Sequence, residues 1–382
     1  MYLIIKGWEK MKLRRTVYAE IYLDNLVNNL NYIREISKNK NIIGVVKDNA
    51  YGHGIVHIGK KLCENNVSML AVSNIEEAIK LRESNIKIPI LIMGVTNLNC
   101  VDELVNYGFT QTITSFEYAI LLSERLKKIS KVLKVHIKID TGMGRVGLFA
   151  SDENYEIVNN IFRNPFFDVE GIYSHFSDAD NEDKAYTVYQ YKLFSSFCNN
   201  LEKLKLNIKY KHISASSGIL NFDKDVLNCS RPGLLLYGYM QNLGKKHTQF
   251  KPVMNLKAQI VHIKKIHKGE SIGYGRTYIS DSERVIATVN LGYGDGFPRY
   301  LSNKGKVILK GSYANIVGNI CMDQFMIDIT HIREVKLFDE VLVIGNQGML
   351  SIYPSDIAEI GNTICYEVLC GIRERVSRIY ID

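Results

Sequence analysis

The chain has 382 residues, of which 46% are hydrophobic and 23% are charged. These proportions are ordinary for a folded protein and exclude a largely disordered chain, and the length suffices for a barrel and a second domain. The net charge of +8 comes from lysines spread along the chain, without the basic clusters or zinc-finger spacing of nucleic-acid-binding proteins. We therefore expect no nucleic-acid partner, whereas an anionic small molecule suits the charge.

The seven cysteines are an odd number without a CxxC pair. This pattern predicts free thiols in a reducing compartment and no metal site. The apolar run at the N-terminus is too short for a secretory signal, and no stretch reaches the length of a membrane-spanning helix. We expect a cytoplasmic protein without membrane contact.

The first predicted elements are an alternating strand at Val17–Tyr22 and a helix with Asp24 as its N-cap. Eight short strands rich in Ile and Val follow, separated by helical segments such as Asn74–Glu83 and Ser115–Lys128. Strands that are apolar throughout are typical of a sheet covered on both faces. The alternation predicts an α/β fold, a (β/α)8 TIM-like barrel. The predicted barrel strands are Asn41–Val46, Ser68–Ser73, Ile88–Gly94, Phe109–Thr114, Leu133–Asp140, Phe167–His175, Tyr210–Ser214 and Cys229–Leu236.

The pattern changes near residue 248, where short strands alternate with glycine-containing turns. This indicates a mainly antiparallel β domain with one helix at Tyr353–Ile360. Its predicted strands are Val253–Ile266, Arg284–Asn290, Lys306–Lys310, Ala314–Val317, Phe325–Ile329 and Glu340–Ile344. We predict an N-terminal extension at 1–16, a barrel at 17–247 and a β domain at 248–382, which the Val17–Tyr22 strand joins.

Polar residues recur where the predicted barrel strands end, which is where barrel enzymes place their chemistry. Lys47 follows an apolar strand and precedes a loop with two glycines, Gly52 and Gly54. Partial burial disfavours the charged form of an amine, and a neutral amine can attack a carbonyl or act as a base. An isolated lysine at this place would more simply be a solvated strand end, so the other motifs decide.

The motifs that follow occur in one order along the chain. They are Val-Val-Lys47-Asp-Asn-Ala-Tyr51-Gly-His-Gly, Lys138-Ile-Asp-Thr-Gly-Met-Gly-Arg145, Tyr-Ser-His175-Phe, Ser-Arg231-Pro-Gly233, Gly-Tyr274-Gly, Gly-Tyr293-Gly-Asp295-Gly, Cys-Met322-Asp323 and Tyr366-Glu-Val. Together they resemble the motifs of the alanine racemase family, pyridoxal-phosphate enzymes with a barrel and a C-terminal β domain. The resemblance runs from about Val17 to the end of the chain.

The resemblance implies an isomerase that interconverts L-alanine and D-alanine and supplies D-alanine for the peptidoglycan of the cell wall. Its cofactor would be pyridoxal 5'-phosphate, held as a covalent aldimine to Lys47. Racemisation removes a proton from one face of Cα and returns one to the other, so two bases are needed. Lys47 and Tyr274 would be these bases. The resemblance further implies a homodimer in which Tyr274 and Met322 reach the barrel of the other subunit.

Other residues match positions that hold the cofactor in the family. Arg231 would face the pyridine nitrogen, where a guanidinium that stays charged disfavours protonation and weakens the ring as an electron sink. His175 would pack against the ring, and His212 would join Arg231 and Tyr274 in a hydrogen-bonded chain. The phosphate would be bound by Tyr51, Ser216, Gly233, Leu234 and Tyr366. The chain departs from the family pattern at Ala215, where an asparagine is usual; Ser217 is a candidate replacement for that contact.

The amino-acid substrate would meet Arg145, whose fork suits a carboxylate, and the backbone N–H of Met322. Lys138 matches a lysine that is carbamylated in many members of the family, and the sequence does not say whether it is modified here. Tyr293 and Tyr366 would form the inner gate of an access corridor that Asp295 and Asp323 line.

Three other functions share parts of this pattern. Related barrel decarboxylases would be expected to carry a Gly-Gly-Gly phosphate loop and a His-x-Gly-Ser stretch, and both are absent. A racemase of another small amino acid such as serine stays open, because an apolar pocket rejects a hydroxyl poorly. A non-catalytic pyridoxal-phosphate-binding protein would not need residues 250–382, which carry Tyr274 and Met322.

Overall fold

The computed structural model describes residues 15–37, 39, 41–222, 227–240 and 249–382. These residues form two compact units. One is the described part of Met1–Asp24 together with Pro252–Asp382, and the other is the described part of Asn25–Lys251. Most of the predicted N-terminal extension and the predicted boundary at 247–248 lie outside the described residues, and the predicted domain limits stay predictions.

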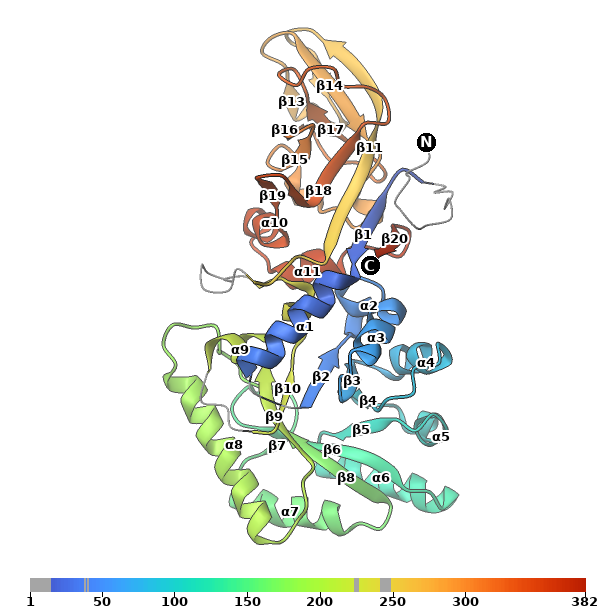
Figure 1. Cartoon of the computed structure of the whole chain (residues 1–382), viewed down its shortest axis with the longest axis vertical. Helices are drawn as coiled ribbons and strands as arrows, with labels where there is room; N and C mark the ends of the chain where they lie inside the picture. The colour runs from blue at the N-terminus through green and yellow to red at the C-terminus, as the bar shows by residue number, and fades with distance from the viewer. Residues whose placement is uncertain (1–14, 38, 40, 223–226, 241–248) are drawn as a thin grey trace. The chain divides into compact units, whose positions relative to one another are not determined.

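The second unit is a closed barrel of parallel strands, as predicted (Figure 1). The ring closes because β5 pairs with β6, and β10 pairs with β2, both in parallel. A short strand, β7 (Leu148–Phe149), extends β6 outside the ring. The barrel strands are β2 (Asn41–Val45), β3 (Met69–Val72), β4 (Ile90–Ile92), β5 (Thr110–Ile113), β6 (Leu133–Asp140), β8 (Phe167–Tyr173), β9 (Tyr210–Ala215) and β10 (Cys229–Arg231).

Helices connect and cover these strands (Figure 1). Asn74 and Ser115 cap α4 and α6, where their side chains accept hydrogen bonds from the backbone N–H groups of Glu77 and Tyr118. The predicted cap at Asp24 is wrong, because α1 begins at Leu23 and Asp24 lies in its first turn. The helices are α1 (Leu23–Ser37), α2 (Lys47–Tyr51), α3 (Ile55–Glu64), α4 (Ile75–Glu83), α5 (Val101–Asn106), α6 (Phe116–Ile129), α7 (Asp152–Arg163), α8 (Ala185–Lys203) and α9 (Ser216–Asn221), with short 3₁₀ turns at Leu98–Cys100 and Leu234–Tyr237.

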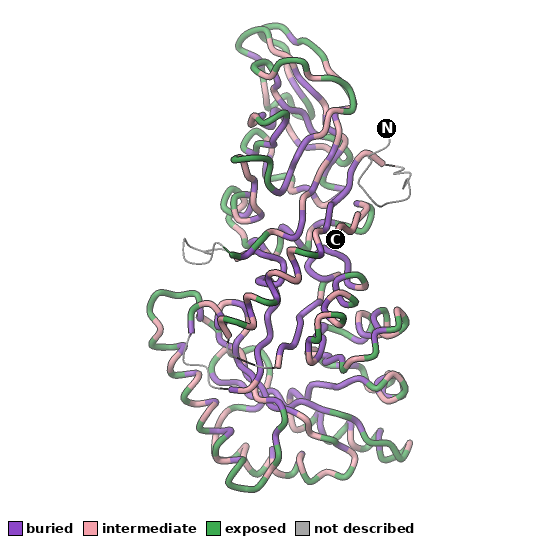
Figure 2. The backbone as a smooth tube through the Cα atoms, in the orientation of Figure 1, coloured by how far each residue is buried: buried purple, intermediate pink, exposed green. Residues whose placement is uncertain are grey.

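The barrel strands are buried along most of their length, as Figure 2 shows. All four residues of β3 are buried, and so are those of β4 and β5. Each fully buried aliphatic side chain contributes about 1.5–3 kcal/mol to stability. The predicted strand Cys229–Leu236 stops at Arg231, because Pro232 has no N–H to offer a neighbouring strand.

The first unit is mainly an antiparallel β-sheet, as predicted. Its longest strand, β11 (Met254–Ile266), pairs with β1 (Tyr18–Tyr22), β14 (Arg284–Val289) and β18 (Glu340–Gln347). Strand β1 also pairs in parallel with β20 (Ser377–Ile381), which the sequence pattern missed. The remaining elements are β12 (Ser271–Ile272), β13 (Tyr278–Ile279), β15 (Lys306–Leu309), β16 (Ser312–Val317), β17 (Phe325–Asp328), β19 (Leu350–Ile352), α10 (Pro354–Gly361) and α11 (Cys365–Cys370), with 3₁₀ turns at Tyr274–Arg276, Tyr293–Asp295 and Arg299–Leu301.

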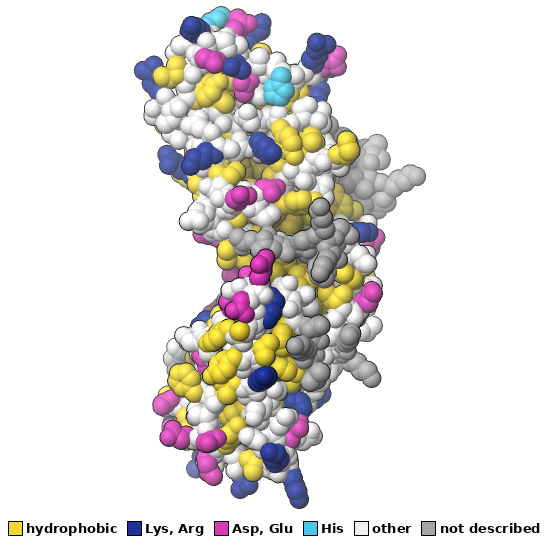
Figure 3. Space-filling view, turned by 90° about the vertical axis from the view of Figure 1, so that its left-hand side faces the viewer, with side chains coloured by type: hydrophobic (Ala, Val, Ile, Leu, Met, Phe, Trp, Pro, Cys, Tyr) yellow, Lys and Arg dark blue, Asp and Glu magenta, His cyan; other side chains and the backbone are white. Residues whose placement is uncertain are grey.

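The surface carries charges of both signs. Lysine and arginine side chains are interspersed with aspartate and glutamate over the face shown in Figure 3, which agrees with the scattered lysines of the sequence. Within the described part of the chain, none of the helices combines the length and the apolar character needed to cross a bilayer.

The segment directly after Lys47 has a left-handed backbone conformation, which L-amino acids disfavour. Asp48, Asn49, Ala50 and Tyr51 all have φ between 50° and 55°, the left-handed helical region. This conformation costs roughly 1–2 kcal/mol for each residue other than glycine. Neighbouring groups offset that cost: the Asp48 N–H donates to Glu77 Oε1 at 2.5 Å, and the Ile55 N–H donates to Asn49 Oδ1 at 2.9 Å. The turn places Lys47 and Tyr51 on a rigid support.

The strain predicts an unusual order of stability at Asp48, whose side chain is exposed. We expect Asp48→Gly to be more stable than Asp48→Val by about 1–2 kcal/mol, because glycine adopts positive φ freely and a β-branched residue does not. Thermal unfolding midpoints of the two variants measure the difference.

A matched pair at Glu156, exposed in the right-handed helix α7, should show the reverse order. Valine is the better helix former there by a few tenths of a kcal/mol, about the difference in helix propensity. The strain at Asp48 is disproved if both sites rank the two substitutions alike.

Candidate active site

Parallel strands bring their carboxyl ends to one rim of the barrel, and the predicted residues of the barrel gather there. Lys47 follows β2 and is half-buried, Lys138 lies in β6, and Arg231 ends β10. His175 comes two residues after β8, and Ser216 begins α9 directly after β9. The sequence therefore places cations, an imidazole and a hydroxyl around one mouth.

Arg231 is the most heavily bonded residue of this mouth. It is 2% exposed, and one of its terminal nitrogens donates to the carbonyl oxygens of Ser174 at 2.7 Å and Ile213 at 3.1 Å. The same nitrogen lies 3.1 Å from His175 Nδ1, and the other lies 2.5 Å from His212 Nδ1. A guanidinium can only donate hydrogen bonds, so His212 accepts at Nδ1. The two N–H groups of the other nitrogen are shared among the two carbonyls and His175 Nδ1.

This constraint fixes the tautomers of two buried histidines. His212 accepts from Arg231 at Nδ1, so its proton is on Nε2, which lies 3.1 Å from His136 Nδ1. His136 Nδ1 must accept the hydrogen bond from His212 Nε2–H, so the proton of His136 is on its own Nε2. Burial, reinforced by Arg231, lowers the pKa of His136 to about 3 and holds the pKa of His212 well below its ordinary value. Both rings are neutral.

The ring of Tyr173 lies against this chain. It stacks on His212 with centroids 4.8 Å apart and planes inclined by 7°, and the Arg231 guanidinium carbon lies 5.0 Å from its centroid. Its hydroxyl is 3.1 Å from Thr112 Oγ1. The Tyr173 ring thus makes a cation–π contact with Arg231. It also stacks on the imidazole of His212 and holds its plane.

Positive charge at the mouth exceeds negative charge. Burial, together with Arg231 and Arg145, lowers the pKa of Lys138 to about 7, although Asp140 acts in the opposite direction. Burial and the surrounding cations, among them Lys47, hold the pKa of His175 well below its ordinary value. A site with several cations around one carboxylate favours an anionic ligand.

Asp140 organises the loop that carries Arg145. Its carboxylate accepts hydrogen bonds from the N–H groups of Gly142 at 2.8 Å, Gly144 at 2.9 Å and Arg145 at 3.2 Å. Burial alone would raise the pKa of Asp140, but these donors outweigh burial and the pKa lies below its ordinary value. The Tyr186 hydroxyl holds the loop from the other side by donating to the Gly142 carbonyl at 2.9 Å.

A second cluster of donors surrounds Ser216. Its hydroxyl oxygen lies 3.1 Å from the Gly233 N–H and 3.3 Å from the Leu235 N–H. A Cβ at Gly233 would stand 2.5 Å from the Tyr51 hydroxyl, so only glycine lets the backbone approach that phenol. Hydroxyls and backbone N–H groups are the ligands that proteins use for phosphate. Ala215 adds no polar side chain here, and Ser217 lies in the next position of α9.

Two predicted residues of the β unit are exposed. Tyr274 is 75% exposed and Met322 is 54% exposed. The carbonyls of Cys321 and Met322 accept hydrogen bonds from the N–H groups of Tyr293 at 3.1 Å and Gly294 at 2.8 Å. The Tyr293 turn therefore fixes the backbone beside Met322.

Asp295 does not line a corridor, contrary to prediction. It is 1% exposed, and its carboxylate pairs with Arg15 at 2.6 Å and Arg375 at 2.8 Å. Arg375 also pairs with Asp323 at 2.6 Å, and Asp323 stays exposed. The carboxylate of Asp295 can be buried because Arg15 and Arg375 compensate its charge, and it connects these two residues.

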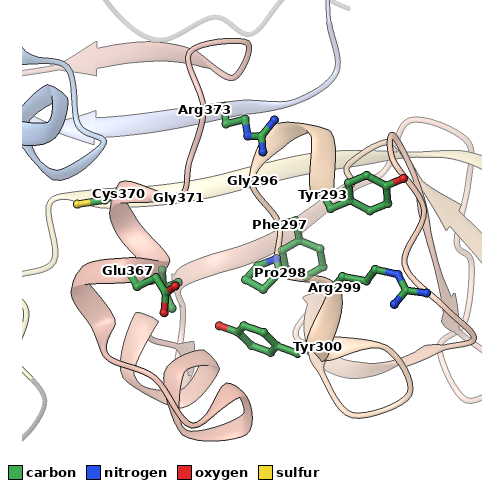
Figure 4. A pocket seen from close by; sticks show the side chains of 11 residues that line it. Tyr293, Gly296, Phe297, Pro298, Arg299, Tyr300, Glu367, Cys370, Gly371 and Arg373 are labelled. Carbon is green, nitrogen blue, oxygen red and sulfur yellow. The ribbon is translucent and has the colours of Figure 1, made fainter.

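A hollow of about 400 Å³ opens beside Tyr293 in the β unit (Figure 4). Tyr300 and Glu367 lie on facing sides of it. Burial first, and then the Glu367 carboxylate, raise the pKa of Tyr300, so its phenol stays a hydrogen-bond donor. Tyr366, the other predicted gate residue, is not among the residues that line the hollow.

Several residues of the mouth escaped sequence reasoning as site residues. Asp140 precedes the Thr-Gly-Met-Gly turn, and a carboxylate before a glycine-containing turn is a detectable signal for a loop held by backbone N–H groups. His136 and Tyr173 sit inside strands that read as ordinary buried sequence, so nothing in the pattern distinguishes them. They are found only when the barrel brings three strands together.

A closed parallel barrel joined to a β-sheet unit is the architecture of two-domain barrel enzymes, and the cationic mouth favours an anionic ligand. Residues 21–241 match the family model described as "Alanine racemase, N-terminal domain", and residues 253–380 match "Alanine racemase, C-terminal domain". The chain belongs to the alanine racemase family.

Relatives and solved structures agree over the whole length. The alanine racemase of Clostridium novyi (strain NT) is 44% identical over 370 residues, 96% of each chain. The solved alanine racemase of Clostridium difficile 630 superposes with a TM-score of 0.91 at 37% identity and covers 97% of both chains. The alanine racemase of Bacillus anthracis, described with bound L-Ala-P, has a TM-score of 0.90 at 32% identity, with 97% of this chain and 96% of that chain covered.

The bonds to Asp140 predict a pH-dependent loop. Because the pKa of Asp140 is depressed in the folded protein, its stabilising effect is complete above the ordinary pKa and is lost as pH falls through the folded value. We expect the amides of Gly142, Gly144 and Arg145 to lose protection from hydrogen exchange below about pH 3.8, the unperturbed value.

Asp140→Asn should show faster exchange of the same amides already at pH 7, by about tenfold, as for loss of hydrogen bonds to a charged group. Mass spectrometry of exchange, corrected for intrinsic rates, measures both effects. Equal protection in the two proteins at pH 7 would rule out this role of the carboxylate.

Proposed function

We propose that this protein interconverts L-alanine and D-alanine. The observation that carries the proposal is the group of cations around Lys47 at the barrel mouth, in a chain that matches an alanine racemase over 96% of its length. The family uses pyridoxal phosphate, an anion with a phosphate, a phenolic oxygen and an aldehyde. A cationic mouth, an amine at its edge and a cluster of hydroxyl and N–H groups fit these three features.

The residues that would hold the cofactor are those with matching chemistry. Lys47 would bind its aldehyde carbon, Arg231 would face its pyridine nitrogen, and His175 would pack beside the ring. Tyr51, Ser216, Gly233, Leu234 and Tyr366 would bind the phosphate. When bound, pyridoxal phosphate supplies a ring that withdraws electrons and so acidifies the Cα proton of an amino acid. Because Arg231 donates from both terminal nitrogens and stays charged, it would keep that withdrawal moderate.

Two groups would then move protons. Lys47 would take or return the proton on one face of Cα, and Tyr274 would do so on the other. We propose a homodimer in which Tyr274 and Met322 of one subunit meet the barrel mouth of the other. The high exposure of both side chains within a single chain supports their use at an interface.

The substrate carboxylate would bind Arg145 and the Met322 backbone N–H. Asp140 holds the Arg145 loop in place through backbone bonds alone, which leaves the guanidinium available for the ligand. His212 would act by orienting Arg231. Lys138 would contribute an amine that is partly neutral at physiological pH, because its pKa is about 7. Tyr293 and Asp323 would border the route of access.

The cellular role follows from the reaction. D-alanine for peptidoglycan is made from the L-enantiomer of the cytoplasm, and the seven cysteines of the chain are all free thiols, as in proteins of reducing compartments. We propose a cytoplasmic enzyme that supplies D-alanine for cell-wall synthesis.

Replacing Lys47 tests the attachment of the cofactor. Lys47→Ala should remove the covalent link, so the absorbance of the protein incubated with pyridoxal phosphate becomes that of the free aldehyde, and racemisation falls by at least about three orders of magnitude. Lys134→Ala is the matched control, since Lys134 is an exposed lysine of β6 paired with Glu170. An unchanged spectrum in Lys47→Ala would remove Lys47 from this role.

Replacing Tyr274 tests the second base. Enantiomers have equal free energies, so any variant must keep kcat/KM equal for the two directions, and the asymmetry appears only in isotopic measurements. With Tyr274→Phe we expect the primary deuterium effect for Cα-deuterated alanine to rise for one enantiomer only. Tyr278→Phe, a half-buried tyrosine of β13, should leave both effects unchanged. Equal isotope effects for the two enantiomers in Tyr274→Phe would contradict two opposed bases.

A further inference from the structure

The backbone around Tyr274 is conformationally unusual. Gly273 and Gly275 have φ of 72° and 73°, and Arg276 has φ of 53°. Arg276 is not glycine, so its left-handed conformation costs about 1–2 kcal/mol and persists only where neighbours hold it. The turn therefore needs external support to keep the Tyr274 side chain in one place, because that side chain is itself exposed.

Two side chains bond to the residues of this turn, and one of them bonds to Tyr274 itself. The Ser271 hydroxyl accepts from Arg276 Nε at 3.0 Å. Asn319 Nδ2 donates to the Tyr274 carbonyl oxygen at 2.7 Å. The contact is close on both sides of Tyr274: a Cβ at Gly273 would stand 3.4 Å from the Asn319 backbone nitrogen, and one at Gly275 would stand 3.5 Å from Asn319 Nδ2. The turn is thus packed on Asn319.

A second asparagine holds the end of the turn. Asn303 Nδ2 lies 3.0 Å from Thr277 Oγ1, and Asn303 Oδ1 accepts from the Gly318 N–H at 2.6 Å. Gly318 directly precedes Asn319. The side-chain amides of Asn319 and Asn303 therefore connect this backbone to Tyr274 at the start of the turn and to Thr277 at its end.

The backbone that carries Asn319 leads directly to Met322, whose N–H is the predicted contact for the substrate carboxylate. Asn319 stands three residues before Met322, and the carbonyls of Cys321 and Met322 are bonded to the Tyr293 turn. These bonds do not involve Asn319. The bonds that hold Met322 therefore do not use the Asn319 side chain, whereas the bond to the Tyr274 carbonyl does.

We propose that Asn319 is a positioning residue that sets the distance between the proton-transferring phenol of Tyr274 and the substrate carboxylate held at Met322. The proposal rests on the proposed function for its catalytic meaning. It requires that loss of the Asn319 amide affect proton transfer on the Tyr274 face and leave binding of the carboxylate unchanged.

The kinetic test uses the cofactor-loaded enzyme with Asn319→Ala. We expect kcat to fall about tenfold in both directions, the effect of one lost hydrogen bond in the transition state, with KM changed by less than about twofold because Met322 stays in place. The primary deuterium effect should rise for the enantiomer that Tyr274→Phe identifies and not for the other. Asn319→Gln, which keeps an amide, should restore part of kcat.

The control is Asn315→Ala, an exposed asparagine of the neighbouring strand β16, which should behave as the unmodified enzyme. An unchanged kcat in Asn319→Ala, a KM that rises with the fall in kcat, or isotope effects that rise for both enantiomers would each overturn the proposal.

A structural measurement separates this proposal from the proposed function. The Arg276 N–H is bonded to the Gly273 carbonyl within the turn at 3.3 Å. Its exchange with deuterium should accelerate in Asn319→Ala and not in Asn315→Ala, with or without the cofactor. Unchanged exchange sinks the role of Asn319. Faster exchange, combined with equal isotope effects in Tyr274→Phe, leaves Asn319 as the support of the turn and removes Tyr274 as a base.

Discussion

The mouth of this barrel depends on the fact that a guanidinium donates hydrogen bonds and never accepts them. Arg231 is buried and donates from both terminal nitrogens, so each group that it bonds must present a lone pair. The Nδ1 atoms of His175 and His212 face it, and the carbonyls of Ser174 and Ile213 accept hydrogen bonds from it. Burial is the largest cause of the low pKa of Lys138 and of the nearby imidazoles, and the permanent charge of Arg231 is the second cause. Burial and this one charge thus act in the same direction on the neighbouring groups.

The two units contribute different kinds of order. In the barrel, side chains converge because parallel strands end at one rim, and Asp140 and Ser216 hold loops through backbone N–H groups. In the β unit, Tyr274 and Met322 lie on turns that are tied to one another by Asn319 and by the Tyr293 turn. These bonds do not use the Lys47 amine, the Tyr274 phenol or the Arg145 guanidinium, which suits the roles proposed for them.

Sequence reasoning reached the barrel, the β domain and the family because each has a periodic or motif signal. The strands of the barrel are short apolar runs between amphipathic helices, and Asn74 and Ser115 stand where caps belong. Single-chain patterns could not show that Asp295 is buried, because its two arginines come from opposite ends of the chain. The same holds for β20, which reads as an ordinary C-terminal tail until β1 pairs with it, and for the left-handed turn after Lys47, whose residues carry no glycine at the strained positions.

The chain of imidazoles behind Arg231 ends at His136. Among the described residues, nothing accepts a hydrogen bond from its Nε2, and a Cβ at Gly171 would stand 2.7 Å from that nitrogen. Each ring of this chain accepts at Nδ1, and the bonds all run in one direction, from Arg231 through His212 to His136. Hydrogen bonds in such a row polarise one another. The two neutral imidazoles therefore form a fixed dipole directed away from the guanidinium, and Arg231 is the charged member of the row.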